Sequence, residues 1–164
     1  VQSWIGILES SFIIFLLRPF HSNYKKSIIK RPKLYFVDTG LACALLGIHT
    51  EDQLQMHPLR GALFENMVVS DKWKKNLHTG GFIQFYYWRE KNSREIDLIE
   101  ESEGKVKVIE IKASSTSTLD FWKHLLYWKK LRPDAQMEVI YMGQTAHTIH
   151  DVRVVPWTTS SRID

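Results

Sequence analysis

Three acidic residues and one lysine are spaced so that they could carry out metal-dependent chemistry. Glu110 and Lys112 lie in VIEIKAS, which is typical of a strand, and alternate side chains of a strand point to the same face. Asp97 lies in REIDLIE, a second strand-like segment, and Glu65 lies in LFENMVVSD, which is typical of an amphipathic helix. If the two strands pair, Asp97 can meet Glu110 across them, and we expect all four side chains to converge at one strand end.

This combination of side chains predicts the hydrolysis of phosphodiesters. Hard divalent cations favour oxygen ligands, so Asp97, Glu110 and the backbone carbonyl of Ile111 are the predicted ligands of Mg²⁺ or Mn²⁺. Such a cation lowers the pKa of bound water and acts as a Lewis acid on phosphate. Lys112 would position the water or balance developing negative charge. Glu65 would orient a metal-bound water or complete a second metal site.

Each of these residues also has a purely structural interpretation. Glu65 and Asp97 could be ordinary solvent-facing carboxylates, and Glu110 and Lys112 could form an exposed pair that contributes roughly 0.2–1 kcal/mol. The full set favours a nuclease-like site, but spacing does not report turnover, because such folds also serve as binding modules. Two hypotheses therefore stay open: a metal-dependent nuclease, or a non-catalytic module that binds nucleic acid or protein.

The elements expected to position these residues follow one another in a regular order. Helices are indicated by apolar residues at helical spacing, and strands by β-branched and aromatic residues between polar turns. The order α-β-β-β-α-β predicts an α/β fold. The expected elements are a helix over 58–78, strands over 82–88, 94–100 and 105–113, a helix over 119–131 and a strand over 138–142.

The region before this core has a different character. Residues 1–17 are expected to form a helix that runs into a strand, and 34–37 a second strand, followed by a short helix over 41–46 that Gly47 ends. Between the strands lies a basic loop that is predicted to contact phosphates without reading sequence. Its basic residues are Lys25, Lys26, Lys30, Arg31 and Lys33.

The order helix, strand, basic loop and strand is similar to the end of a winged helix. The alternative is a β-hairpin that packs on a helix and has a solvated, charged loop. We divide the chain into a winged-helix-like segment over 1–52, expected to be truncated at its N-terminus, and a second unit over 53–164.

Composition sets the outer limits of these interpretations. The chain has 164 residues, of which 44% are hydrophobic, and a formal net charge of +4, which is compatible with a nucleic-acid partner. Cys43 is the only cysteine, so a disulfide within the chain is excluded and a reducing, cytoplasmic location is expected. The longest apolar run, residues 12–17, is too short to span a bilayer, so we expect no membrane partner.

The acidic and lysine residues described above resemble the motif of the PD-(D/E)XK nuclease superfamily, with Glu65 in the first helix, Asp97 in the second strand, and Glu110 and Lys112 in the third. This resemblance implies a restriction-endonuclease-like αβββαβ core over 53–164. The chain also resembles the C-terminal winged-helix plus nuclease-like region of archaeal and bacterial AAA-type ATPases. The matching stretches are LYFVDTGLACALLGI, HPLRGALFENMVVS, FYYWRE, EIDLI and VIEIKAS.

The resemblance to AAA-type ATPases implies a longer parent protein. The 164 residues contain no G-x-x-x-x-G-K-[ST] phosphate loop, so ATP binding is expected only in an N-terminal ATPase domain outside them. The expected partners are nucleic acid, with DNA the preferred polymer, and the ATPase domain of the same chain. The nuclease-like region of such ATPases has no assigned function.

Overall fold

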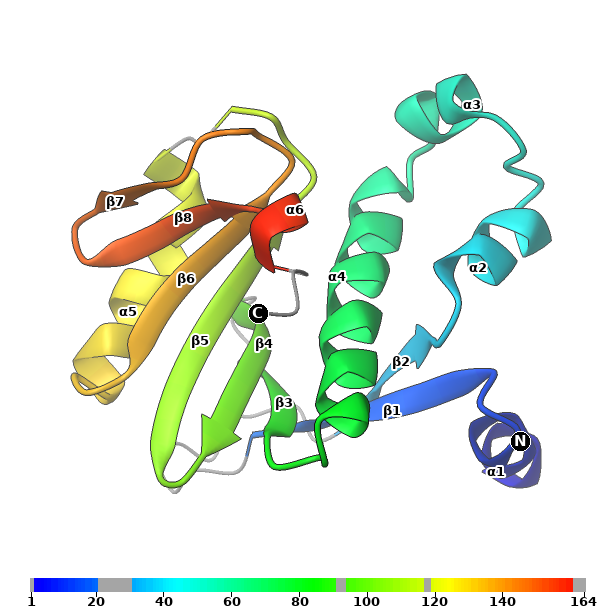
Figure 1. The fold of residues 1–164 in the computed structure, drawn as a ribbon, viewed down its shortest axis with the longest axis horizontal. Coiled ribbons are helices and arrows are strands. Elements are labelled where there is room, and N and C mark those ends of the chain that lie inside the picture. The colour runs from blue at the N-terminus through cyan, green and yellow to red at the C-terminus, as the bar shows by residue number, and fades with distance from the viewer. Residues whose placement is uncertain (1, 21–30, 91–93, 117–118, 161–164) are drawn as a thin grey trace.

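A mixed β-sheet of eight strands forms the centre of the molecule (Figure 1). The computed structural model describes residues 2–20, 31–90, 94–116 and 119–160. Spatial order across the sheet is β2-β1-β3-β4-β5-β6-β8-β7. The strands are β1 (Ile14–Pro19), β2 (Lys33–Phe36), β3 (Gln84–Arg89), β4 (Glu95–Ser102), β5 (Lys105–Lys112), β6 (Gln136–Tyr141), β7 (His147–Ile149) and β8 (Val152–Pro156).

The sheet combines hairpins with parallel crossovers. β1 and β2, β3 and β4, β4 and β5, and β7 and β8 pair antiparallel, whereas β1 and β3, β5 and β6, and β6 and β8 pair parallel. The crossover from β5 to β6 carries a helix, as parallel neighbours require a long connection. β5 lies between β4 and β6, so it is a central strand and its last residues lie well inside the sheet.

Two of the helices cover the two faces of this sheet (Figure 1). The helices are α1 (Gln2–Ser10), α2 (Thr39–Leu45), α3 (Glu51–Met56), α4 (Arg60–His78), α5 (Lys123–Leu131) and α6 (Trp157–Ser160), and a 3₁₀ turn, η1 (Leu119–Trp122), precedes α5. Local sequence explains two of the starts. Asp38 caps α2 by accepting from Gly40 N, and Thr50 with Gln53 forms a capping box at α3.

Each face of the sheet has its own hydrophobic core. On the α4 face, Val68 and Val69 pack with Leu98 of β4, Ile109 of β5 and Phe15 of β1. The α5 face is filled by alternate residues of the same strands together with α5 side chains. Its buried members include Ile96, Ile99, Val108, Leu125 and Trp128. Because strand side chains alternate between faces, one strand supplies both cores, and β4 and β5 are buried on both sides.

The predicted α/β fold is confirmed, and the order α4-β3-β4-β5-α5-β6 follows the order expected from sequence. The segment 1–17, which was expected to form a helix that runs into a strand, contains α1 and most of β1, and the predicted strand 34–37 corresponds to β2. These first strands join the same sheet as the core, since β1 lies parallel to β3. α3, α6 and the β7–β8 hairpin were not expected. No helix in the described part of the chain is long and apolar enough to cross a membrane.

Candidate active site

Asp97 and Glu110 are buried opposite one another on two neighbouring strands. β4 and β5 pair with Leu98 facing Ile109, so the next step of this register sets Asp97 against Glu110. Asp97 is 8% exposed and Glu110 is 3% exposed. The Asp97 Oδ2 atom accepts a hydrogen bond of 2.8 Å from the backbone N–H of Ile111. Two carboxylates therefore lie close together in the interior, where isolated charges are unfavourable.

A β-bulge in β4 helps to aim Asp97. Between two paired positions β3 advances two residues, from Tyr86 to Trp88, whereas β4 advances three, from Ile99 to Ile96. The additional residue interrupts the alternation, so that Ile96 and Ile99 both join the α5-side core. Bulges of this kind re-aim side chains, and they recur beside active sites. Simple alternation along REIDLIE could not indicate where Asp97 points.

Lys112 and His124 face Glu110. The Lys112 Nζ atom donates to Glu110 Oε1 at 2.6 Å, and His124 Nδ1 of α5 lies 3.9 Å from the same oxygen. The second oxygen, Glu110 Oε2, is buried and has no hydrogen-bond partner among the described residues. Buried carboxylate oxygens are usually satisfied, so this atom requires an explanation.

Glu65 enters the group from α4. Its Oε1 atom accepts from the Tyr35 hydroxyl at 2.5 Å and from Lys33 Nζ at 2.9 Å. Lys33 also forms an ion pair with Glu95 at the start of β4, and Glu95 in turn lies 3.3 Å from Arg89 Nε. Strand β2 thus places Lys33 and Tyr35 beside Glu65.

Burial and mutual repulsion set the protonation of the two inner carboxylates. Burial raises the pKa of Asp97 well above its usual range, and the negative charges of Glu110 and Glu65 raise it further. The Lys33 charge and the Ile111 N–H act in the opposite direction but do not compensate. Burial also raises the pKa of Glu110, although Lys112 and His124 oppose this. At neutral pH the site therefore disfavours two free negative charges.

The two lysines of the site remain charged. Burial alone would lower the pKa of Lys33, but Glu65, Asp97 and Glu95 outweigh it and raise that pKa. Burial would likewise lower the pKa of Lys112, and Glu110, Asp97 and Glu65 reverse the effect. The charges of Glu65 and Asp97 therefore act on both lysines. Burial, followed by the charge and hydrogen bond of Glu65, raises the pKa of Tyr35, so its hydroxyl stays protonated and donates.

The structure brings together the four residues singled out from sequence, Glu65, Asp97, Glu110 and Lys112. Within the described part of the chain, however, no group of three or more Asp, Glu, His or Cys side chains is arranged to hold a metal ion. This agrees with the orientation of Glu65, whose Oε1 atom is engaged by Lys33 and Tyr35. Two carboxylates, rather than three, are arranged as potential ligands.

The structure describes only two of the five predicted phosphate-binding residues, Arg31 and Lys33. Lys25, Lys26 and Lys30 lie outside the described residues. Arg31 is exposed, and its backbone carbonyl accepts a hydrogen bond from the Tyr87 hydroxyl. Lys33, which we expected in the basic loop, instead begins β2 and points to Glu65 and Glu95, because β2 carries it to the acidic group.

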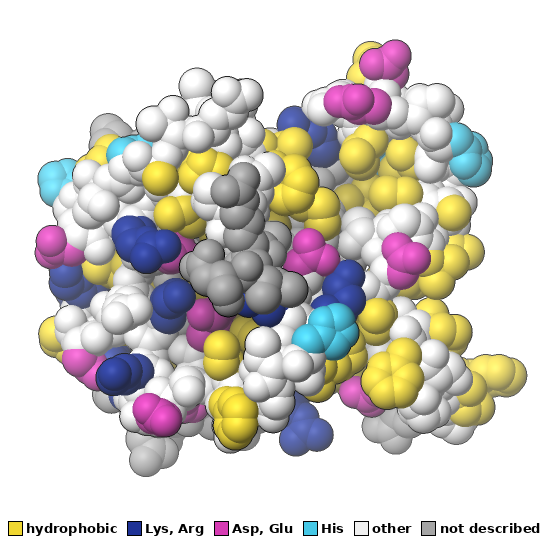
Figure 2. All heavy atoms as spheres, viewed as in Figure 1, with side chains coloured by type: hydrophobic (Ala, Val, Ile, Leu, Met, Phe, Trp, Pro, Cys, Tyr) yellow, Lys and Arg dark blue, Asp and Glu magenta, His cyan; other side chains and the backbone are white. Residues whose placement is uncertain are grey.

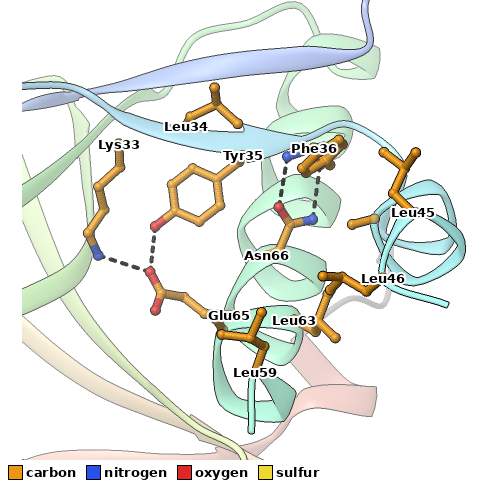
Figure 3. Close-up of a pocket in the computed structure, with 12 residues that line it drawn as sticks. Lys33, Leu34, Tyr35, Phe36, Leu45, Leu46, Leu59, Leu63, Glu65 and Asn66 are labelled. Carbon is orange, nitrogen blue, oxygen red and sulfur yellow. Dashed lines mark hydrogen bonds and ion pairs between the residues drawn. The ribbon is translucent and has the colours of Figure 1, made fainter. Parts of the chain in front are cut away.

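A cavity of about 480 Å³ adjoins the site (Figure 3). Lys33, Tyr35 and Glu65 line one end of it, and leucines of α2 and α4 line the other. Figure 2 shows hydrophobic side chains gathered over this part of the molecule, where Leu45 and Leu59 are exposed. The acidic group therefore borders an apolar groove.

Sequence reasoning missed Tyr35, Glu95 and His124, and it assigned Lys33 a different role, as a phosphate contact of the basic loop. Lys33, Tyr35, Glu95 and His124 each approach Glu65 or Glu110 directly or through a neighbour. Lys33 and Tyr35 alternate on one strand, as Glu110 and Lys112 do, so their common face was readable. The sequence did not show that this strand, β2, lies beside Glu65 of α4. Its position depends on the long-range pairing of β1 with β3, which places the β1–β2 pair at the edge of the sheet.

The fold and the grouped side chains define an α/β domain with a buried acidic and lysine site. The chain belongs to the family described as a domain of unknown function, DUF4143, whose model matches residues 60–160. A second family model, domain of unknown function DUF8612, matches residues 1–52. All four motif residues lie in the first match, whereas Lys33 and Tyr35 lie in the second.

Two curated relatives are similar to almost the whole chain. The uncharacterized protein Rv2008c of Mycobacterium tuberculosis and the uncharacterized protein Mb2031c of Mycobacterium bovis are each 29% identical over 154 residues, which is 93% of this chain. The chain spans 33% of the length of these relatives. No solved structure matches the chain significantly.

Proposed function

We propose that this chain is a divalent-metal-dependent phosphodiesterase domain of the nuclease type, acting on nucleic acid as part of a longer protein. The observation that carries the proposal is the buried pair Asp97 and Glu110, with Glu110 Oε2 lacking a partner in the described residues. Burying two like charges side by side is costly, and folds retain such pairs mainly where a function requires them. The resemblance of the motif to PD-(D/E)XK nucleases supports the same function, with DNA as the expected polymer.

The side chains fit a hard cation. Asp97 and Glu110, with the backbone carbonyl of Ile111, would hold Mg²⁺ or Mn²⁺, which prefer oxygen ligands. A bound cation would supply an acidified water and polarise the phosphate. Its charge would also relieve the repulsion that raises the pKa of Asp97.

The chain's own side chains would complete the chemistry. Lys112 is held 2.6 Å from Glu110, so a compact positive charge is fixed beside the place where a phosphate would lie. It would balance the negative charge that grows on phosphate oxygens as water attacks, which is an interaction strongest in the transition state. Glu65 is fixed by Tyr35 and Lys33, and it would orient water at the other side of the group.

One observation favours a second function, a non-catalytic module for nucleic acid or protein. Among the described residues, no three metal-binding side chains are clustered. Such a module would be attached to the ATPase that the sequence resemblance implies for the remainder of the parent protein. In either case Lys25, Lys26, Lys30 and Arg31 are the expected contacts to phosphates.

A cleavage assay separates these two functions. Single- and double-stranded DNA and RNA are incubated with the chain, and with its longer parent plus ATP, in Mg²⁺, Mn²⁺ or EDTA. We expect slow metal-dependent cleavage that Asp97→Ala and Asp97→Asn both abolish together with metal affinity. The matched control is Asp71→Asn, an exposed carboxylate of α4 paired with Lys74.

The outcomes of this assay are distinct. Cleavage that persists in EDTA, or that Asp97→Asn leaves unchanged, points to a contaminating enzyme or another site. Absence of cleavage by the parent protein with ATP, combined with retained nucleic-acid or protein binding, supports the interaction module. Folding of each variant is checked by circular dichroism and thermal unfolding before activity is compared.

A further inference from the structure

Lys33 lies between two carboxylates at the edge of the site. Its Nζ atom is 2.9 Å from Glu65 Oε1 (Figure 3). It also contacts Glu95, so it sits between a carboxylate of α4 and one of β4. The Lys33 side chain is 21% exposed and that of Glu65 is 24% exposed. The pair is therefore partly shielded from water, where an ion pair is stronger than at the surface.

Tyr35 fixes the same carboxylate from the same strand. Its hydroxyl donates to the oxygen that Lys33 contacts, and its ring is buried and stacks on Phe15. Two residues of β2 thus hold Glu65 Oε1 in one position (Figure 3). Because Tyr35 and Lys33 are anchored by the β1–β2 hairpin, Glu65 can turn toward a metal only by breaking both interactions.

We propose that Lys33 is a built-in cation of the site, which holds Glu65 as a positioning residue and leaves one divalent-metal position, between Asp97 and Glu110. The inference rests on the proposed function, and it means that two segments of the chain together build the site. The segment matched by the DUF8612 model supplies Lys33 and Tyr35, and the segment matched by DUF4143 supplies the metal ligands.

The charges of the group support a single metal position. Two carboxylates, Glu65 and Glu95, are neutralised by Lys33, and Arg89 also lies 3.3 Å from Glu95. Glu110 is paired with Lys112, and the charge that acts on Asp97 is that of Lys33, which is already shared with Glu65 and Glu95, so an excess of negative charge remains at Asp97 and Glu110. A second divalent ion beside Glu65 would have to displace an ammonium from two carboxylates at once, which is unfavourable for a partly buried pair.

The test is Mn²⁺ binding to the 164-residue chain by titration calorimetry, with Lys33→Met and the control Lys72→Met. Lys72 is also a partly buried lysine, on α4, and donates to Glu100 at 2.8 Å outside the site. We expect one Mn²⁺ in the wild-type chain and in Lys72→Met. Lys33→Met should bind Mn²⁺ on the order of tenfold more tightly, or bind a second ion, since a positive charge has been removed.

The turnover number, in contrast to metal affinity, should fall. Lys33→Met and Tyr35→Phe should lower kcat, because Glu65 loses its fixed orientation, while Lys33→Arg should restore part of it. Tighter metal binding with slower turnover is a combination that general destabilisation does not produce. Two Mn²⁺ ions in the wild-type chain, or unchanged stoichiometry and affinity in Lys33→Met, would overturn the inference.

Crystal structures of Lys33→Met and Tyr35→Phe without metal give a second readout, which separates this inference from the proposed function. The inference expects the Glu65 carboxylate to leave its position in Lys33→Met while β4 and β5 stay in place. An unmoved Glu65 would refute the positioning role even if the chain cleaves nucleic acid. Failure of the wild-type chain to bind Mn²⁺, with Glu65 displaced in the variant, would leave the positioning role standing and would refute the metal position and the proposed function.

Discussion

The two ends of the β4–β5 pair carry ionic groups of opposite composition. At one end, Glu100 accepts from Lys72 at 2.8 Å and lies 3.4 Å from Lys107, so one carboxylate is shared by two lysines. At the other end, Asp97 and Glu110 are both buried, with Lys112 paired to Glu110 and the charge of Lys33 divided among Asp97, Glu65 and Glu95. α4 crosses both ends and contributes Lys72 to the first and Glu65 to the second.

The difference lies in how far each group is compensated within the fold. The Glu100 group has a counter-charge on each side, so burial of the carboxylate is compensated within the fold. The Asp97 and Glu110 group has excess negative charge and one buried oxygen without a partner among the described residues. Under the proposed function a bound cation supplies the missing positive charge, and the contrast can be tested at each end.

The largest effect is expected from Lys112→Ala. Turnover should fall on the order of 10²–10³, because the ammonium acts mainly on charge that develops in the transition state. Metal binding should not weaken, since lysine is not a ligand and removing a positive charge beside Glu110 favours a cation. The measurement is kcat with Mn²⁺ under saturating nucleic acid, together with a metal titration. Lys107→Ala, on the same strand but beside Glu100, is the control, and an equal loss in both variants would argue against a special role for Lys112.

Neutralising the carboxylate at the compensated end should destabilise the fold. Glu100→Gln leaves Lys72 and Lys107 without their negative partner, and charged hydrogen bonds of this kind contribute about 1.5–3 kcal/mol. The free energy of unfolding, measured by denaturant titration, should fall by that order, while Mn²⁺ binding stays unchanged. Altered metal affinity in Glu100→Gln would show that the two ends are not independent.

Neutralising Asp97, at the other end of the β4–β5 pair, should stabilise the fold. Burial and neighbouring charges raise the pKa of Asp97, so its contribution to stability is present at low pH and is lost as the pH rises through that raised value. Asp97→Asn keeps an oxygen that can accept from Ile111 and removes the charge. We expect Asp97→Asn to be more stable than the wild-type chain, with a higher Tm, at pH 8 in EDTA.

The pH dependence checks the sign of this effect. Near pH 4, where a free aspartate is about half protonated, the advantage of Asp97→Asn should almost vanish, and it should grow as the pH increases. Asp71→Asn, the exposed control on α4, should show no such growth. A variant less stable than wild type at pH 8 would mean that the charge of Asp97 is compensated in the fold after all.

Much of the fold could be predicted from local patterns. The helix α4 and strands β3 to β6 have clear periodicity, and they were expected within a few residues of their observed bounds. The β7–β8 hairpin was missed because its turn is formed by His150 and Asp151, both with positive φ, instead of by an Asn-Gly or Gly-containing pair. Short segments with unusual turn residues carry little sequence signal.

The grouping of the four motif residues could be predicted in part, whereas the residues around them could not, and their role as metal ligands stays a prediction. Glu110 and Lys112 share a face because they are two residues apart on one strand, which is a local rule. The position of Asp97 depends on a bulge, and the contact of Lys33 with Glu65 joins residues 32 apart in sequence. Both depend on tertiary pairing, which local periodicity does not encode.

The parallel pairing of β1 with β3 has a practical consequence for work on this family. A fragment that begins at residue 53 would lose β1 and leave the backbone groups of β3 open as a free edge strand, at the positions now paired by Arg18 and Pro19. It would also uncover the α4 face against which Phe15 and Leu17 pack. Such a fragment is expected to self-associate through strand addition, so the segment matched by the DUF4143 model should be produced together with the residues that precede it.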